Sequence, residues 1–506
     1  MSSRTFVAVV CALWLALAGA VPLAEASPFS AIQIRQLIIN KLQRKKATVG
    51  VFIGDALTGE TLFEYNGSSS FTPASVVKIV TSVAALRILG PQYKFPTEFF
   101  VDTMPVDDSG RVGTLYIRGY GDPTMVTERL WKVASDLRVR GVTQIDRLVV
   151  DDTLFIDPPA PSGPRAYQAG NSALSLNHNS YAVSVVPSVV GRPARTIVTD
   201  GYDVEIRNTV QTVAGHRNRL VLDHRPPSPS FSPVARSERL AGLISLQLDP
   251  PTVITSGSVG AKNDVITNYR TVPYPPVYFA QVFRRLLRAQ EITVGDEILV
   301  GQTPAQARLL IVEESIPLVE ILRDLNHYSN NFIAEQLVFA MGQDDVGYFR
   351  HDLGVGRMAR FLESLGVAPG SFSIVDGSGL SREDKLSPAQ LHRVLVEAYR
   401  DFSLLPGFVS SLSRFGESGT LRKRPLLSRR SGRTEVFAPA PPELGVWGKT
   451  GTLTGVSSVC GYLRLPNSRT ITYVVMINGR IAKSVATDLE DAILKGLIRH
   501  ANPGTE

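Results

Sequence analysis

Hydrophobic and polar positions alternate in two short runs near the beginning of the chain. The first run covers residues 48–55 and the second covers 61–65, with turn-forming residues between them. Alternation on both sides of a turn predicts a β-hairpin. Apolar positions at helical spacing then follow over residues 75–89, and Gly90-Pro91 ends this stretch. Ser75 is therefore predicted to lie at the N-terminus of a helix.

The pattern of apolar positions changes in the region 95–300, where short strand-like runs replace the longer helical patterns. A segment rich in Pro and Ser, residues 225–233, predicts an exposed loop. Helical spacing over 277–290 predicts a helix that leads back to the first part of the fold. We interpret 95–300 as an inserted β-rich region, with a nested subdomain at about 187–255.

The last third of the chain predicts helices followed by strands and a final helix. Helical spacing recurs over 316–342 and 351–365, strand patterns cover 445–451, 456–463 and 470–477, and 484–500 is an amphipathic helix. Packing of this last helix on a sheet explains its apolar face better than attachment to a membrane. The expected fold class is α/β (α+β), with a sheet flanked by helices built from residues 27–94 and 301–506.

The N-terminus has the pattern of an export signal. Arg4 precedes an apolar run over residues 6–18, and small residues suited to cleavage end at Ala20 or Ala26. A membrane anchor is the alternative, but the run is short for a span of about 20 residues. We therefore expect a signal peptide over 1–26, a mature protein in the periplasm and no transmembrane anchor.

Composition limits the classes of protein that fit. The 506 residues are 44% apolar and carry a net charge of +7, which favours a globular protein attracted to anionic envelope polymers. Nucleic acid is not an expected partner, because no zinc-finger spacing and no RNP-like segment occurs. Cys460 is the one cysteine left after loss of Cys11, so it cannot form an intramolecular disulfide, and its apolar surroundings predict a buried core residue.

Three short motifs carry candidate chemistry. They are Ser75-x-x-Lys78, Ser329-x-Asn331 and Lys449-Thr450-Gly451. Each is weak by itself, but their order and their predicted positions at a helix start, in a helical region and on a strand make the set specific.

The chemistry of Ser75 explains why a lysine belongs in this set. A serine hydroxyl needs a base to become a nucleophile, and Lys78 lies on the same face of the helix. Apolar neighbours make Lys78 a cleft residue rather than a surface lysine, and burial beside another cation, such as Lys449, would lower its pKa.

Other ways to build an active site fit the chain less well. Gly448-Lys449-Thr450 resembles the end of a phosphate-binding loop, but Glu443 occupies the position of the required glycine and a strand follows. No Gly-x-Ser-x-Gly occurs, and none of the seven histidines is an obvious partner of Ser75; His327 is given a structural role. No His-Glu-x-x-His or other ligand cluster occurs, so neither a metal nor a cofactor is expected.

In this order, and with a large insert after the first, the motifs resemble the class C low-molecular-mass penicillin-binding proteins. These are D-alanyl-D-alanine carboxypeptidases and endopeptidases of the penicillin-binding protein 4 type. Further similar segments are Gly119–Thr124, Ser172–Asn179, Asp376–Arg382 and Lys449–Val456. The resemblance implies a penicillin-binding-protein/β-lactamase-like serine transpeptidase fold, split by one or two β-rich domains.

The resemblance also implies roles for the motif residues. Ser75 would attack the carbonyl between two D-Ala residues, Lys78 would take its proton, and Ser329 and Asn331 would serve the leaving amine and the substrate amide. Lys449 and Thr450 would bind the terminal carboxylate of the substrate, with Thr452 nearby, and Gly451 of the same motif is also a candidate substrate-binding residue. The backbone N–H groups of Ser75 and Thr452 would form the oxyanion hole. Peptidoglycan stems and cross-links are the implied substrates, and β-lactams would acylate Ser75.

Several points stay open at this level. Arg382 is a candidate for binding the carboxylate of a diaminopimelate side chain, with a surface turn as the alternative, and Tyr167 is a candidate wall of the substrate pocket. The balance between carboxypeptidase and endopeptidase activity is open, as is assembly, with a homodimer considered. A β-lactamase is disfavoured by the 254 residues between Ser75 and Ser329, and a non-catalytic wall-binding protein by the intact motifs.

A basic run precedes the third motif. It consists of Arg422, Lys423, Arg424, Arg429, Arg430 and Arg433. Such a run is usually a solvated loop, and contact with anionic wall polymer is the alternative hypothesis.

Overall fold

The computed structural model describes residues 31–42, 45–102, 109–199, 201–225, 229–232, 243–248, 250–424, 428–431, 434–437, 445–465 and 468–501. The predicted signal peptide, residues 1–26, lies outside these ranges. Within them, every helix is too short or too polar to cross a membrane.

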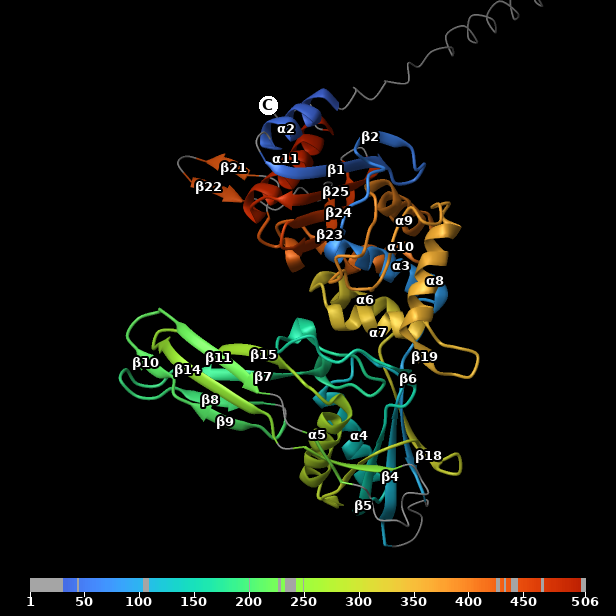
Figure 1. Cartoon of the computed structure of the whole chain (residues 1–506), viewed down its shortest axis with the longest axis vertical. Helices are drawn as coiled ribbons and strands as arrows, with labels where there is room; N and C mark the ends of the chain where they lie inside the picture. Colours follow the sequence, from blue (N-terminus) through green and yellow to red (C-terminus); the bar gives the residue numbers. More distant parts are fainter. Residues whose placement is uncertain are drawn as a thin grey trace, which may run out of the picture.

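A six-stranded antiparallel sheet forms the centre of one half of the molecule (Figure 1). Its order is β2 (Thr61–Tyr65), β1 (Lys46–Asp55), β25 (Thr470–Arg480), β24 (Val456–Arg464), β23 (Gly445–Leu453) and β20 (Ser413–Arg414). Strand β24 is buried on both faces from Val456 to Leu463, as expected of a strand covered by helices on both sides. The predicted hairpin and the predicted strands before the last helix are confirmed.

Two layers of helices cover this sheet. Helices α2 (Ala31–Leu42) and α11 (Lys483–Ala501) pack on one face. The other face packs against α3 (Lys78–Ile88), α6 (Leu318–His327), α7 (Asn331–Met341), α8 (His351–Ser364), α9 (Pro388–Arg400) and α10 (Leu405–Ser411). Helix α3 lies inside this second layer and is buried on every side from Lys78 to Leu86, so its first residues face the interior of the domain.

The insert is built on an eight-stranded sheet with two helices. Its order is β12 (Pro229–Ser232), β13 (Ile244–Leu248), β17 (Ile298–Val300), β5 (Gln144–Asp151), β4 (Arg111–Gly119), β3 (Pro96–Val101) and β18 (Arg308–Glu314), and β16 (Thr293–Val294) also pairs with β5. Helices α4 (Thr127–Val139) and α5 (Pro275–Ala289) pack on this sheet. Because β18 returns alongside β3, the chain leaves the insert close to where it entered.

Two smaller sheets extend the insert to one side (Figure 1). One contains β9 (Glu205–Asn208), β10 (Gln211–Val213), β14 (Thr252–Gly260) and β11 (Arg219–Arg225), and the other contains β15 (Ile266–Thr271), β7 (Ser180–Val186) and β8 (Arg195–Val198).

The insert is held against helix α7. The side chain of Gln336, fully buried, donates to the carbonyl oxygens of Gly121 and Ser172, both at 3.1 Å. Phe155 of the insert stacks on Phe339 of α7, with ring centroids 4.2 Å apart. The helix that begins with Asn331 is therefore fixed by both halves of the molecule.

Three local predictions are corrected by the structure, and four helices were not predicted. The helix predicted from Ser75 begins instead with a 3-10 turn, Ala74–Val77, and becomes α-helical at Lys78. The stretch 316–342 is two helices, because the chain breaks between α6 and α7. Helices α2, α4, α9 and α10 were not predicted. The predicted loop at 225–233 contains strand β12, while residues 226–228 and 233 lie outside the described residues.

Candidate active site

Ser75 and Lys78 face each other across one turn at the start of α3. The Nζ of Lys78 lies 3.1 Å from the Oγ of Ser75, and this Oγ lies 3.2 Å from the backbone oxygen of Ser378. The Nζ of Lys78 also donates to the same Ser378 oxygen and to the Oδ1 of Asn331, the latter at 2.7 Å. The lysine is therefore held by three acceptors and directed at the hydroxyl.

The environment of Lys78 suits a base. Its side chain is fully buried, and burial lowers the pKa of Lys78 to about 7, against the raising effect of Glu335, Asp376 and Asp384. A lysine with this pKa is neutral in a substantial fraction of molecules at neutral pH, so it can accept the proton of the serine.

The break between α6 and α7 positions Ser329 and Asn331. Ser329 has a φ of 58°, a left-handed conformation that a residue other than Gly rarely adopts. This conformation ends α6 and lets the side chain of Asn330 cap α7 by accepting from the N–H of Ile333. Strained backbone is common at functional sites, and here it turns Ser329 toward Lys449.

Lys449 completes the cluster from strand β23. Its Nζ donates to the Oγ of Ser329 at 2.7 Å and to the backbone oxygen of Thr450 at 2.8 Å. Burial, together with the nearby charge of Lys78, holds the pKa of Lys449 well below its usual value. Cys460 on β24 is paired with Lys449 in the sheet and is buried, as predicted.

Strand β23 passes directly beside the serine. A Cβ placed on Gly451 would lie 2.7 Å from the oxygen of Pro73 and 3.0 Å from the nitrogen of Ser75, so only glycine lets the strand approach this closely. A cleft of about 530 Å³ opens here. It is lined by residues of all three motifs, namely Ser75, Ser329, Thr450 and Gly451, together with Thr452 and Thr420.

The other two candidate residues, Tyr167 and Arg382, lie outside the cluster that the three motifs form. The backbone oxygen of Tyr167 accepts from the Nδ2 of Asn331 at 3.2 Å, so Tyr167 lies beside the cleft, and its side chain is 51% exposed. The guanidinium of Arg382 donates to the backbone oxygen of Thr454 at 2.7 Å, at the turn between β23 and β24, and is exposed.

Sequence reasoning missed several groups of the site. The backbone oxygen of Ser378 contacts both Ser75 and Lys78, and the charges of Glu335 and Asp376 act on the lysine. Thr420 accepts a hydrogen bond from the Oγ1 of Thr450 at 2.9 Å. The segment Asp376–Arg382 was noted for its resemblance to a family segment, which pointed to this region but not to the backbone oxygen.

The basic run is not a uniformly solvated loop. The side chain of Arg424 is only 13% exposed and forms ion pairs with Glu490 at 2.9 Å and Asp491 at 2.6 Å. Arg422 and Lys423 are exposed. Of the remaining residues, Arg429 and Arg430 belong to β21 (Ser428–Ser431), and Arg433 lies outside the described residues.

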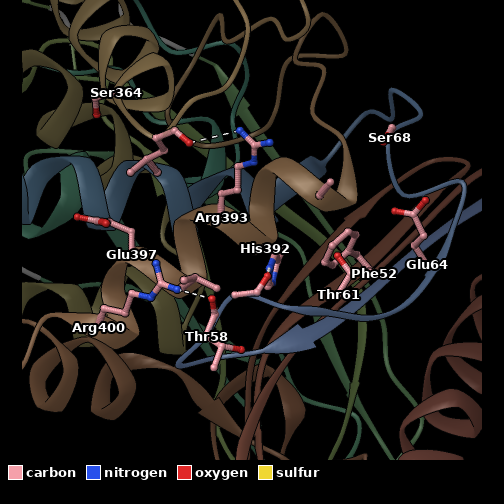
Figure 2. Close-up of a pocket in the computed structure, with 14 residues that line it drawn as sticks. Phe52, Thr58, Thr61, Glu64, Ser68, Ser364, His392, Arg393, Glu397 and Arg400 are labelled. Carbon is pink, nitrogen blue, oxygen red and sulfur yellow. Dashed lines mark hydrogen bonds between the residues drawn. The ribbon is translucent and has the colours of Figure 1, made fainter. Parts of the chain in front are cut away.

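A second pocket, of about 600 Å³, lies between the β1–β2 hairpin and α9 (Figure 2). His392 stacks on Phe52 in this pocket, and burial lowers the pKa of the histidine. Arg393 and Arg400 donate to backbone carbonyls of the neighbouring helix end and hairpin turn. The pocket is separated from β23 by β25 and β24, and its arginines hold the chain in place, so it is not the candidate active site.

Among the described residues, no group of three or more His, Cys, Asp or Glu side chains is arranged as a set of metal ligands.

A sheet with helices on both faces, and three motifs meeting at one cleft, defines a penicillin-recognising serine enzyme. The chain belongs to the D-Ala-D-Ala carboxypeptidase 3 (S13) family, which it matches over residues 32–226 and 234–499. This membership confirms the predicted family and the predicted class of activity, a D-Ala-D-Ala carboxypeptidase.

Individual relatives agree with this assignment. The chain is 30% identical over 509 residues to a D-alanyl-D-alanine carboxypeptidase of Actinomadura sp. (strain R39), covering 96% of this chain and 88% of that protein. It is 23% identical to D-alanyl-D-alanine carboxypeptidase DacB of Haemophilus influenzae, covering 86% of each. The crystal structure of penicillin binding protein 4 from H. influenzae superposes with a TM-score of 0.70 at 21% identity, covering 92% of this chain and 99% of that one. The predicted fold class is thereby confirmed.

Proposed function

We propose that this protein hydrolyses the D-Ala-D-Ala bond of peptidoglycan stem peptides through an acyl-enzyme on Ser75. The observation that carries the proposal is the contact between the Oγ of Ser75 and the Nζ of a buried Lys78 whose pKa is lowered to about 7.

Acylation begins with neutral Lys78. Its Nζ removes the proton of Ser75 while the Oγ forms a bond to the carbonyl carbon of the penultimate D-Ala. The negative charge moves to the carbonyl oxygen, which is held by the backbone N–H groups of Ser75 and Thr452. Loss of one such donor typically costs about 10²–10³ in rate.

The peptide C–N bond then breaks. The departing nitrogen receives the proton that Lys78 removed from Ser75, relayed through Ser329, whose Oγ accepts a hydrogen bond from Lys449. The terminal D-Ala then leaves as a free amino acid. Asn331 holds Lys78 and binds the substrate amide. Thr450 and Thr452, both at the cleft, bind the substrate carboxylate, with the charge of Lys449 behind them.

Water completes the cycle by attacking the ester on Ser75, which releases the shortened stem and restores the hydroxyl. A β-lactam acylates Ser75 in the same way, but its leaving group stays attached and deacylation is slow. Cross-linked stems are a second substrate, since the scissile bond again follows a D-Ala. Arg382 binds a carboxylate on the substrate side chain, and Tyr167 forms one wall.

The location and the domain division belong to the same proposal. The mature protein acts in the periplasm after removal of residues 1–26. The predicted division assigns residues 27–94 and 301–506 to the catalytic domain and 95–300 to the insert, with a nested subdomain at about 187–255. Because β18 pairs with β3 in the sheet of the insert, we place the end of the insert after β18, at about residue 314. The two small sheets of the insert support the nested subdomain. The apolar run over residues 6–18 supports export.

Labelled penicillin tests the proposal on the purified mature protein. We expect a covalent adduct in the native protein and none in Ser75→Ala, with Ser68→Ala, an exposed serine, as the matched control. Release of D-Ala from a pentapeptide stem should follow the same pattern. An adduct that persists in Ser75→Ala would exclude this nucleophile, and rapid turnover of penicillin without an adduct would favour a β-lactamase.

A further inference from the structure

Three carboxylates lie close enough to the candidate base to act on its charge. Glu335, Asp376 and Asp384 each act electrostatically on Lys78. Burial, and then the charge of Asp376, raise the pKa of Asp384 to about 8, so Asp384 is largely neutral at pH 7. Glu335 and Asp376 are the two carboxylates whose charges act most strongly on the lysine.

Glu335 occupies a distinctive position on α7. It follows Asn331 by four residues, so the two side chains lie on the same face of the helix. Its Oε1 accepts a hydrogen bond from the N–H of Gly377 at 3.1 Å, and its Oε2 lies 2.9 Å from the Nε2 of His351 on α8. Its side chain is only 15% exposed.

The contact with Gly377 fixes the backbone that holds the catalytic pair. Asp376 binds the next turn of this segment, because its carboxylate accepts from the N–H groups of Ser378, Gly379 and Ser381. The backbone oxygen of Ser378 then accepts from both Ser75 and Lys78.

We propose that Glu335, held by His351, is a positioning residue for acylation: it anchors the Gly377–Ser378 backbone and places a negative charge near the Lys78 ammonium. This inference rests on the proposed roles of Ser75 and Lys78.

The groups around Lys78 determine in which direction Glu335 shifts the charge state of the lysine. Glu335 on α7, Asp376 and Asp384 on the 376–384 segment and Lys449 on β23 surround Lys78. A carboxylate near an ammonium favours its protonated form, so Glu335 opposes the deprotonation that burial promotes.

His351 moderates this effect. Burial disfavours its charged form, but the hydrogen bond and charge of Glu335, with Asp376 and Asp352, outweigh burial and raise the pKa of His351. A protonated His351 beside Glu335 offsets the negative charge that Lys78 experiences.

If Glu335 acted only through its hydrogen bonds, the expected result would differ from the one expected if its charge also acts on Lys78. If Glu335 only supports the backbone, its replacement by a residue of the same shape slows acylation equally at every pH. If it also sets the charge state of Lys78, removal of its charge and removal of the histidine charge shift the pH profile in opposite directions.

The experiment is the rate of acylation by labelled penicillin as a function of pH, in the full mature protein. Protonation of Lys78 makes the rate fall at low pH, and we call this fall the acid limb of the pH profile. Glu335→Gln keeps the shape of the side chain and an acceptor for Gly377, and we expect its acid limb to move about one unit lower in pH. His351→Gln keeps a donor for Glu335, and its acid limb should move about half a unit higher. Glu335→Asp keeps the charge on a shorter side chain, so its limb should stay near that of the native protein while its plateau rate falls.

Glu363→Gln, an exposed glutamate on α8, is the matched control and should leave the profile unchanged. The inference would be overturned if the native protein, Glu335→Gln and His351→Gln all had the same acid limb. The proposed function would still stand in that case, because the native protein forms the adduct. Absence of an adduct in the native protein would overturn both. Thermal unfolding of each variant identifies any that fails to fold. If Glu335→Gln does not fold, the fall in the plateau rate of Glu335→Asp tests whether the position of the carboxylate matters.

Discussion

The Oδ1 of Asn331 accepts a 2.7 Å hydrogen bond from the Nζ of Lys78, so the first residue of α7 is tied directly to the first residue of α3. The Nδ2 of the same asparagine donates to the backbone oxygen of Tyr167 in the insert. One side chain therefore connects the candidate base, the second motif and the inserted region. The orientation of Lys78 depends on both halves of the molecule.

Acylation of the native protein should depend on pH with an acid limb near 7. Lys78 can take the serine proton only when neutral, and burial lowers its pKa to about 7. As pH falls below this value the lysine becomes protonated, and the rate should fall about tenfold for each further unit. Stopped-flow measurement with a fluorescent penicillin checks this, and a rate that is constant from pH 5 to 8 would contradict it.

Asn331→Asp should move this acid limb to higher pH. The substitution preserves the shape of the side chain but places a carboxylate against the ammonium of Lys78, which raises the pKa of a lysine by about 1–3 units at such distances. Asn330→Asp, at the neighbouring cap of α7, is the control, because its side chain accepts from the N–H of Ile333 and not from Lys78. The same limb in both variants would argue against the contact between Asn331 and Lys78.

Gly379→Ala should slow acylation about 10²-fold, whereas its matched control should not. Gly379 has a φ of 79°, and a Cβ there would lie 2.1 Å from the oxygen of Ala74 and 2.9 Å from the nitrogen of Ser75. The serine would have to move, and misplacement by about 1 Å can reduce a rate 10²-fold. Gly370→Ala has a similar φ of 77° but meets nothing within 4 Å, so it carries only the backbone strain.

Adduct formation and thermal unfolding distinguish these two variants. Both should be destabilised by about 1–2 kcal/mol from the left-handed backbone alone, but only Gly379→Ala should form the adduct about 10²-fold more slowly. Equal acylation by the two would show that the approach of Gly379 to the nucleophile is not required.

Much of the fold could be predicted because its patterns are local. The β1–β2 hairpin, the helix after Ser75 and the last three strands each have a clear period and a turn or breaker at their ends. The order of the three motifs and their neighbours then identified the side chains that meet at the cleft.

The remaining features depend on contacts between distant parts of the chain. Helical spacing continues across residues 316–342, so nothing local indicates that Ser329 adopts a left-handed conformation. The oxygen of Ser378 is a backbone atom, and side-chain chemistry gives no sign of its contact with Lys78. Arg424 lies within a basic run, and its burial follows only from the position of α11.

Arg424→Ala should destabilise the catalytic domain far more than a change elsewhere in the basic run. Burial disfavours the charge of Arg424, but Glu490 and Asp491 outweigh this and raise its pKa, while Glu490 itself is almost fully buried. Removal of the arginine leaves a buried carboxylate without its counter-charge, which costs about 3 kcal/mol or more. Urea unfolding near pH 7 measures this loss.

The pH dependence of that loss separates electrostatics from packing. Burial raises the pKa of Glu490 and Arg424 lowers it, so removing Arg424 raises it further. Protonation of Glu490 then relieves the unpaired charge, and the stability deficit of Arg424→Ala should shrink as pH falls. Arg422→Ala, at an exposed position, should change the free energy of unfolding by less than about 0.5 kcal/mol at any pH. A deficit that stays constant with pH would mean that Arg424 acts through its packing over the ring of Phe415 instead of through its charge.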